Sequence, residues 1–228
     1  GIRGGSATVH FPIWHQEIED ILVLKNNKGT EDNRVRKLDY SIQLSELFYQ
    51  RFIDNKEISL FSPHNVPNLY ESFGTSEFDE LYNRYENDES IPRTTIGAQE
   101  LILDLLKERA ETGRIYLMNI DHCNTHSSFK DKVNMSNLCQ EITLPTDPIQ
   151  HIDSIDGEIA LCILSAINVG KINSNMDDLE DLCDLSVRAL EELIDYQDYP
   201  VRAAEIATLG RRSLGVGFIG LAHYLAKL

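Results

Sequence analysis

The stretch Asn134-Met135-Ser136-Asn137-Leu138-Cys139-Gln140-Glu141-Ile142 places an amide, a thiol and a carboxylate at alternating positions. In extended backbone alternate side chains share a face, so Asn137, Cys139 and Glu141 could all contact one small molecule. Fully extended, the Cα atoms of Asn137 and Glu141 would lie about 13 Å apart, which is too far to hold a single sugar ring. We therefore expect the chain to bend here and to form the tip of a loop.

The residues around Cys139 suit hydrogen-atom chemistry better than nucleophilic attack. A nucleophilic cysteine is activated by a nearby cation that lowers the pKa of its thiol. Residues 134–142 contain no lysine, arginine or histidine, and the charged neighbour, Glu141, disfavours a thiolate. Taken alone, however, a cysteine is more often a buried, chemically inert thiol. The segment by itself therefore leaves a catalytic and a structural interpretation of Cys139 open.

The composition is that of a globular protein. The 228 residues are 42% hydrophobic and 25% charged, enough for a substantial core. The net charge of −16 argues against a nucleic-acid partner, because binding to a phosphate backbone requires a basic surface. No apolar run reaches the length of a membrane helix, and no signal peptide is recognisable. The 4 cysteines are scattered in a chain too long to need disulfide staples, which favours a reducing, cytoplasmic setting.

Hydrophobic periodicity and turn residues predict alternating helices and strands. Helices are expected over 12–22, 40–53, 67–73, 77–85, 97–111, 176–196 and most of 201–228. Strands are expected over 58–61 and 115–120, and the apolar segment 158–167 is strand-like although its length also permits a helix. This alternation indicates an α/β fold with parallel pairing. No linker, internal repeat or low-complexity tract is found, so one domain is expected.

Asn137-Leu138-Cys139-x-Glu141 resembles the active-site loop of the large (alpha) subunit of class I ribonucleotide reductase. Further blocks follow in the family's order over nearly the whole chain: Arg3-Gly4-Gly5-Ser6-Ala7-Thr8, Phe11-Pro12-Ile13-Trp14-His15, Lys25-Asn26-Asn27, Leu60-Phe61-Ser62-Pro63-His64, Thr112-Gly113-Arg114-Ile115-Tyr116, Asp121-His122-Cys123-Asn124-Thr125-His126, Gly157-Glu158-Ile159-Ala160-Leu161-Cys162 and Gly210-Arg211-Arg212. Their collinear order makes the resemblance specific, and it is closest to the class Ia enzymes of bacteria and phages. It implies part of a ten-stranded α/β barrel into which an active-site finger loop threads. It also implies that residues 1–228 are a middle piece of the catalytic barrel domain, incomplete at both ends.

The resemblance gives chemical roles to individual residues. It implies that Cys139 becomes the thiyl radical that abstracts hydrogen from the 3′ carbon of the ribose. It implies that Glu141 is the general base on the 3′ hydroxyl and that Asn137 hydrogen-bonds the ribose hydroxyls. From composition alone Cys162, in the apolar run 159–163, would be a small core residue. The resemblance instead makes Cys162 one of two redox-active cysteines that reduce the 2′ position and form a disulfide, with a partner missing from this chain.

The glycine-rich segment at the start of the chain is implied to respond to allosteric effectors. Arg3, Gly4, Gly5 and Ser6 resemble the loop that links the specificity effector to the substrate base. The glycines let the backbone reshape, and Arg3 offers planar, multi-donor contacts to a base or phosphate. The family further implies ribonucleoside diphosphate substrates, dNTP and ATP effectors, and a radical made by a di-iron small subunit. Thioredoxin or glutaredoxin would be the reductant, and the remaining parts of the large subunit would be required.

Two further motifs receive structural interpretations. His122, Cys123 and His126 could be zinc ligands, but no second ligand cluster has zinc-site spacing, so loop packing is favoured and no metal is expected. Residues 215–220 match G-x-G-x-x-G, but a dinucleotide site needs a preceding strand, a following helix and an acid about 20 residues further on. We expect these glycines to allow close helix packing.

The expected function is the reduction of ribonucleoside diphosphates to deoxyribonucleoside diphosphates for DNA synthesis, as part of an assembled large subunit. The isolated chain is expected to be inactive. The alternative is an inactive folded remnant of the same subunit that acts only as a binding or structural fragment. A cysteine hydrolase or transferase would require a low pKa and rapid alkylation of Cys139. A nicotinamide dehydrogenase would rest only on the glycine motif.

Overall fold

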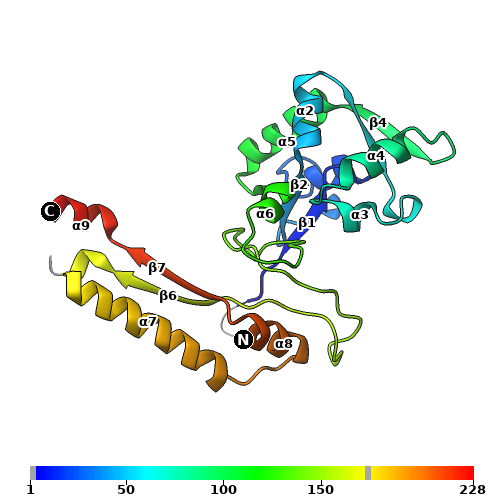
Figure 1. Ribbon diagram of the computed structural model, residues 1–228. Coiled ribbons are helices and arrows are strands. Elements are labelled where there is room, and N and C mark those ends of the chain that lie inside the picture. The colour runs from blue at the N-terminus through cyan, green and yellow to red at the C-terminus, as the bar shows by residue number, and fades with distance from the viewer. Residues whose placement is uncertain (1–3, 173–175) are drawn as a thin grey trace. The chain divides into compact units, whose positions relative to one another are not determined.

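The computed structural model describes residues 4–172 and 176–228 of the chain. The chain forms two compact units, Gly1–Leu144 and Pro145–Leu228, each with its own sheet and helices (Figure 1). The segment 137–141 belongs to the first unit and Cys162 to the second.

A three-stranded parallel sheet forms the centre of the first unit. Its strands are β1 (Thr8–Pro12), β2 (Asp39–Leu44) and β5 (Ile115–Asn119), in the order β1-β2-β5. Ile42 of β2 lies opposite Phe11 of β1 and Leu117 of β5. Because the strands are parallel, their carboxyl ends meet at one edge of the sheet. The helix α6 (Ile120–Thr125) starts at that edge, directly after β5.

The rest of this unit consists of helices and of an antiparallel pair of strands, β3 (Glu57–Phe61) and β4 (Arg93–Gly97). The helices are α1 (Ile18–Leu22), the 3-10 helix η1 (Glu31–Asn33), α2 (Glu46–Ile53), the 3-10 helix η2 (Pro63–Asn65), α3 (Leu69–Ser72), α4 (Phe78–Glu86) and α5 (Ala98–Thr112). The apolar face of α5 buries Leu101, Ile102 and Leu105. Gly113 ends this helix with a φ of +64°, a left-handed conformation that favours glycine.

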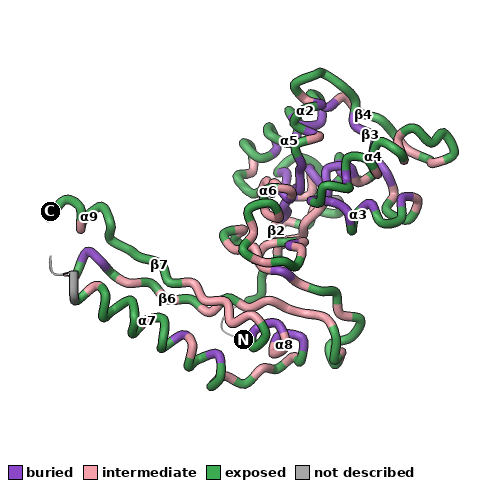
Figure 2. The backbone as a smooth tube through the Cα atoms, in the orientation of Figure 1, coloured by how far each residue is buried: buried purple, intermediate pink, exposed green. Residues whose placement is uncertain are grey.

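Aromatic side chains fill the core of the first unit. The fully buried rings are those of Trp14, Phe48, Phe61, Phe73, Phe78 and Tyr82. The ring centroid of Phe48 lies 5.5 Å from that of Tyr82, 5.9 Å from that of Phe78 and 6.1 Å from that of Phe73. Burial of each ring stabilises the fold by about 2–3 kcal/mol, and edge-to-face contacts add to this. Figure 2 colours most residues of β2 and β3 in this unit as buried.

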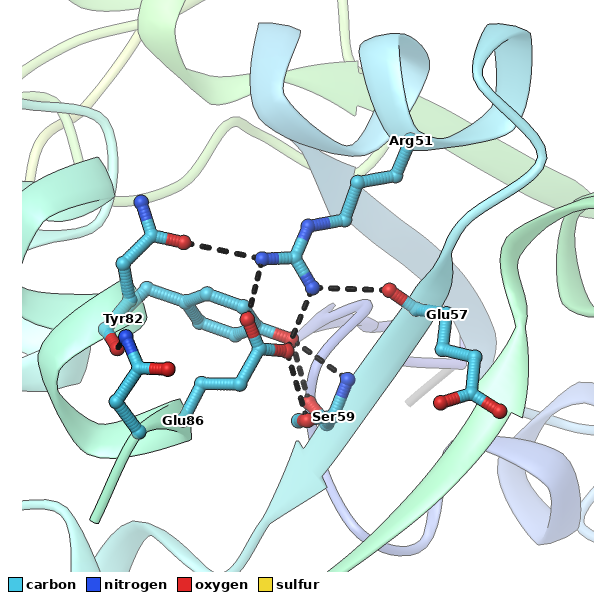
Figure 3. A network of polar contacts seen from close by, with 7 residues as sticks. Arg51, Glu57, Ser59, Tyr82 and Glu86 are labelled. Carbon is cyan, nitrogen blue, oxygen red and sulfur yellow. Dashed lines mark hydrogen bonds and ion pairs between the residues drawn. The ribbon is translucent and has the colours of Figure 1, made fainter.

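A buried polar network, drawn in Figure 3, joins α2, β3 and α4. The two guanidinium nitrogens Nη1 and Nη2 of Arg51 donate to the two carboxylate oxygens of Glu86, each at 2.6 Å, and Nη1 also donates to the Glu57 carbonyl at 2.9 Å. Ser59 Oγ donates to Glu86 at 2.8 Å, and the Ser59 N–H donates to the Tyr82 hydroxyl at 2.8 Å. That hydroxyl donates in turn to the Ser59 carbonyl at 2.7 Å. The network therefore pairs polar groups that burial would otherwise leave without water.

The second unit is built on a two-stranded parallel sheet. It consists of β6 (Ile163–Asn168), the 3-10 helix η3 (Val169–Lys171), α7 (Met176–Tyr196), α8 (Arg202–Arg211), β7 (Leu214–Ile219) and α9 (Leu221–Lys227). Ser165 of β6 points towards α7, because its hydroxyl hydrogen-bonds the Ser186 hydroxyl. The alternate residues Leu164 and Ala166 are exposed. None of the helices in the described ranges combines the length and the apolar composition that crossing a bilayer demands.

The expectation of an α/β fold with parallel pairing is confirmed in both units. The helices predicted over 67–73, 77–85, 97–111 and 176–196 are present, as are the strands predicted over 58–61 and 115–120, with shifted ends. Of the predicted strand 158–167, β6 supplies only the later part. The sheets formed by the described residues are open, so a ten-stranded barrel is not established by this chain. The expectation of a single catalytic domain stays a prediction.

Three predicted helices are wrong in part. Pro12 ends strand β1, and α1 starts only at Ile18. Residues 40–44 form β2. A helix was predicted there because the apolar residues continue at helical spacing into α2. Residues 214–219 form β7, where a Cβ at Gly215 would lie 2.5 Å from Cδ2 of Leu164 on β6. This glycine therefore allows close strand packing rather than helix packing.

Candidate active site

Residues 137–142 form a tight turn at the tip of the loop that follows α6. The Asn137 N–H donates to the Ile142 carbonyl at 3.2 Å, and the Gln140 N–H donates to the Asn137 carbonyl at 3.1 Å. The Ile142 N–H returns to the side-chain oxygen Oδ1 of Asn137 at 3.1 Å. Gln140 has a φ of +64°, a left-handed backbone that costs a non-glycine residue about 1–2 kcal/mol. The bend expected between Asn137 and Glu141 is therefore present.

The turn gives the three predicted residues different environments. Cys139 and Glu141 are exposed, whereas Asn137 is half-buried. Oδ1 of Asn137 accepts the Ile142 N–H at 3.1 Å and the Ser136 hydroxyl at 3.4 Å. The Nδ2 group is therefore the part of this amide that can donate to a ligand. The structure thus brings an amide donor, a thiol and a carboxylate together on one turn.

Side chains and backbone of the central sheet hold the turn. The amide oxygen of Gln140 accepts a hydrogen bond from the Ser41 hydroxyl of β2, and its Nε2 donates to the Leu117 carbonyl of β5, both at 2.5 Å. The Thr8 hydroxyl of β1 donates to the Leu138 carbonyl at 2.6 Å. All three strands therefore contact the residues on either side of the predicted catalytic thiol.

A second set of contacts fixes the segment that leads into the turn. Gln43 of β2, only 1% exposed, donates from Nε2 to the Asn134 carbonyl at 2.7 Å. Asn124 of α6 pairs with the backbone of Val133: its Oδ1 accepts the N–H at 2.8 Å and its Nδ2 donates to the carbonyl at 3.0 Å. Val133 is itself fully buried. The loop is therefore anchored by β2 and α6 before it reaches the turn.

The Cys139 thiol is exposed on the turn. Across residues 4–172 and 176–228, no side chain makes a hydrogen bond or ion pair with this thiol. Burial lowers the pKa of His10 on β1, and a smaller opposing effect of the Ser136 backbone does not reverse this, so the imidazole is neutral at pH 7. Hydrogen-atom chemistry at Cys139 stays a prediction.

An open hollow of about 390 Å³ lies beside the turn. Its lining residues come from β5, α6 and the loop: Leu117, Met118, Asn119, His122, Cys123, His126, Gln140 and Thr143. The rings of His122 and His126 meet edge to face with centroids 5.6 Å apart, and burial raises the pKa of the Cys123 thiol. Among the described residues, no three His, Cys, Asp or Glu side chains are grouped so as to hold a metal ion. The expectation of no metal site stays a prediction.

The other predicted site residues lie outside this turn. Cys162 is exposed, directly before β6, so it is not the core residue that composition alone indicates. It belongs to the second unit, and its position relative to the turn is not assigned. Gly4, Gly5 and Ser6 are exposed and belong to no helix or strand, while Arg3 lies outside the described residues. A Cβ on Gly4 or Gly5 would meet no atom within 4 Å, so a side chain would fit at either position.

Sequence reasoning missed the residues that hold the turn. In residues 40–44 the polar Ser41 and Gln43 alternate with apolar residues, and both are almost fully buried. Buried polar groups need partners, so this alternation is a signal that could have been used. Gln140 carried no such signal, because its partners lie 99 and 23 residues away in the chain.

Comparison with known proteins decides the family. A family model described as the barrel domain of ribonucleotide reductase matches residues 1–228. The chain belongs to the ribonucleotide reductase family. Its relatives include the ribonucleoside-diphosphate reductase subunits alpha of Haemophilus influenzae, Escherichia coli K12 and Enterobacteria phage T4, which are 58%, 53% and 46% identical to it. These matches cover 100% of the chain but only 31%, 30% and 30% of the relatives, so the chain spans about a third of their length.

The family match confirms the resemblance drawn from the ordered sequence blocks. The family model matches residues 1–228 and therefore covers both compact units. The turn at 137–142 therefore lies within the barrel-domain match.

Proposed function

We propose that this chain is part of the catalytic large subunit of a ribonucleoside-diphosphate reductase. The assembled subunit reduces ribonucleoside diphosphates to deoxyribonucleoside diphosphates for DNA synthesis. The observation that carries the proposal is the turn at 137–142, in which Cys139 and Glu141 are exposed. The central sheet holds the neighbouring residues Leu138 and Gln140 by hydrogen bonds. The names of the relatives, ribonucleoside-diphosphate reductase subunits alpha, support it.

In this reaction Cys139 transfers a hydrogen atom twice. Removal of the hydrogen atom from its S–H leaves a thiyl radical. The thiyl takes the hydrogen atom from the 3′ carbon of the ribose and re-forms the S–H bond. Once the 2′ position has been reduced, that hydrogen atom returns to the 3′ carbon and the thiyl is regenerated. The thiol needs no neighbouring cation for these steps, because hydrogen atoms are transferred and no thiolate attacks.

Glu141 and Asn137 act on the ribose hydroxyls, and Cys162 takes part in the reduction. Glu141 accepts the proton of the 3′ hydroxyl, which promotes loss of the 2′ hydroxyl as water. Asn137 donates through Nδ2 to the ribose hydroxyls. Cys162 and a second cysteine from elsewhere in the subunit together supply two hydrogen atoms. One of these hydrogen atoms leaves with the 2′ hydroxyl in that water molecule, the other is added to the 2′ carbon, and the two sulfur atoms join in a disulfide.

The architecture and the partners follow from the same proposal. The sheets β1-β2-β5 and β6-β7 would be portions of a ten-stranded α/β barrel that other parts of the large subunit complete. A di-iron small subunit would supply the radical, and thioredoxin or glutaredoxin would reduce the disulfide. Residues 3–6 would lie between a bound dNTP or ATP effector and the substrate base. The assembly would work in the cytoplasm.

The test is Cys139→Ser in the assembled reductase, with Cys183→Ser as a matched control. Both cysteines are exposed, but Cys183 lies on α7 and has no role in the proposed reaction. We expect no detectable deoxynucleotide from Cys139→Ser and the unchanged rate from the control, because a serine O–H bond is too strong to be opened by the same radical. Substantial turnover by Cys139→Ser would contradict the radical role.

An inactive remnant is the competing function. It would leave the wild-type assembly without turnover even when the small subunit, a thiol reductant and all other parts of the large subunit are present. A cysteine hydrolase would instead show rapid alkylation of Cys139 near neutral pH.

A further inference from the structure

We infer that Gln140 is a positioning residue for the catalytic thiol, an inference that rests on the proposed function. Gln140 lies between Cys139 and Glu141 in the turn. Those two side chains are exposed, whereas the amide of Gln140 is bonded to β2 and β5 of the central sheet. The residue between the two reacting groups therefore connects them directly to the central sheet.

The backbone conformation of Gln140 is unusual for a glutamine. Its φ of +64° is a conformation in which glycine or asparagine is expected. A longer residue is kept in such a conformation only where the surrounding contacts over-determine it. Two hydrogen bonds of 2.5 Å, one accepted from Ser41 and one donated to Leu117, provide those contacts. Glycine would relieve the backbone but could make neither bond.

The partners of Gln140 are rigid. Ser41 is fully buried in β2, the middle strand of the sheet, so its hydroxyl cannot turn to water if the amide is removed. Leu117 lies in β5, opposite Ile42 of that same middle strand. On the other side of the thiol, Thr8 of β1 holds the Leu138 carbonyl at 2.6 Å.

The sheet therefore fixes the chain both before and after Cys139. Hydrogen-atom transfer requires that Sγ lie in contact with the 3′ carbon, and a misplacement of about 1 Å can cost about 100-fold in rate. The amide of Gln140 contributes to the rate by restraining this turn, without itself touching the substrate.

Two variants separate positioning from folding. Gln140→Met keeps the length of the side chain but removes both hydrogen bonds. Gln140→Gly removes them as well but suits the left-handed backbone, so it does not add strain. Gln16→Met is the matched control, because Gln16 is an exposed glutamine of the same unit. Each variant is made in the complete large subunit and assayed with the small subunit, a nucleoside diphosphate and a thiol reductant.

We expect kcat to fall about 10- to 100-fold in Gln140→Met and Gln140→Gly, with KM for the nucleoside diphosphate within about threefold of wild type. The control keeps the wild-type values. Hydrogen exchange of the Gln140 and Ile142 amides, which are bonded within the turn, should speed up in both Gln140 variants. The melting temperature of Gln140→Gly should remain close to that of wild type, so that rate and stability separate.

Three results would overturn the inference. The first is an unchanged kcat in both Gln140 variants while the wild-type enzyme is active. The second is a fall in kcat with unchanged exchange of the turn amides. The third is a fall in kcat that is accompanied in both variants by a lower melting temperature, because lost stability would then account for the lower rate. A wild-type assembly without any turnover overturns the proposed function and this inference with it, whereas the exchange measurement still reports whether Gln140 anchors the turn.

Discussion

In the proposed reaction, the side-chain amide of Asn137 contacts both the turn and the ribose. Oδ1 accepts the Ile142 N–H at 3.1 Å, and Nδ2 is left to donate to a hydroxyl in the proposed reaction. Asn137→Asp keeps an oxygen for the Ile142 N–H but replaces the donor by a second acceptor. We expect turnover to fall by about 100-fold or more, the usual effect of losing one well-placed donor, while exchange of the Ile142 amide is unchanged.

Asn137→Ala is the comparison for that experiment, because it removes both functions of the amide. Its Ile142 amide should exchange faster than that of wild type. If the Ile142 amide exchanges as fast in Asn137→Asp as in Asn137→Ala, the separate roles assigned to Oδ1 and Nδ2 are wrong.

Glu141 is predicted to move a proton and not to bind the nucleotide. Glu141→Gln keeps the shape of the side chain but cannot accept the proton of the 3′ hydroxyl. We expect kcat to fall about 10²- to 10⁴-fold with little change in nucleotide affinity. Steady-state kinetics and equilibrium binding measure the two quantities, and Glu89→Gln, at an exposed glutamate, is the control. A collapse of affinity with normal turnover of bound substrate would instead make Glu141 a binding residue.

Single residues were predictable where the signal was local. Asn137, Cys139 and Glu141 stand two positions apart, and their chemistry could be interpreted from that spacing together with the family resemblance. Gln140 and Ser41 lie 99 residues apart, and their contact exists only once the loop has folded onto the sheet. No periodicity in the sequence encodes such a pair. The turn was therefore expected, but the residues that hold it were not.

The ion pair of Arg51 and Glu86 makes the packing of α2, β3 and α4 dependent on pH. Burial alone would raise the pKa of Glu86, but hydrogen bonds from Arg51 and Ser59 and the guanidinium charge lower it below its ordinary value. Because the pKa is lower in the folded state, the stabilisation is fully present above the unfolded value of about 4.3. It is lost as the pH falls through the folded pKa.

We expect Arg51→Met to weaken this packing by about 3 kcal/mol at neutral pH, because it leaves a partly buried carboxylate without its cation. Hydrogen exchange of the Ser59 amide, corrected for intrinsic rates, measures the local opening. Below pH about 4.3, this exchange rate should depend less on pH in the variant than in the wild type. Arg84→Met, at an exposed arginine of α4, is the control. An equal effect of the two substitutions would show that the ion pair does not hold these elements.

Elements were predictable where one face is buried and the ends carry clear signals. α5 has both an apolar face and Gly113 at its end, and it was found with nearly correct bounds. β7 was missed because Gly215 and Gly217 disfavour strands, and it forms only by pairing with β6, a distant segment of the chain. β4 and its antiparallel pairing with β3 were missed as well. Residues 93–97 show little burial, so no buried face marks them as a strand.

For the molecule as a whole, net charge and exposed apolar surface act in opposite directions. The charge of −16 keeps copies of the chain apart. Large apolar side chains are exposed in the second unit: Leu164, Phe218, Ile219 and Leu225 have exposed fractions of 54%, 62%, 54% and 58%. Apolar surface of this kind favours association. Salt shortens the range of charge repulsion to about 10 Å at 0.1 M but leaves apolar attraction in place.

We therefore expect the isolated chain to self-associate, and to do so more strongly as salt is raised. Light scattering after size-exclusion chromatography measures the mass at several salt concentrations. Phe218→Ser combined with Leu225→Ser should reduce association, whereas Leu103→Ser, at a leucine of α5 that is 56% exposed, should not. The same preparation should form no deoxynucleotide, because the proposed disulfide partner of Cys162 is not among its cysteines. Addition of the remaining parts of the large subunit and of the small subunit should both suppress association and restore turnover. A monomeric isolated chain with reductase activity would contradict both expectations.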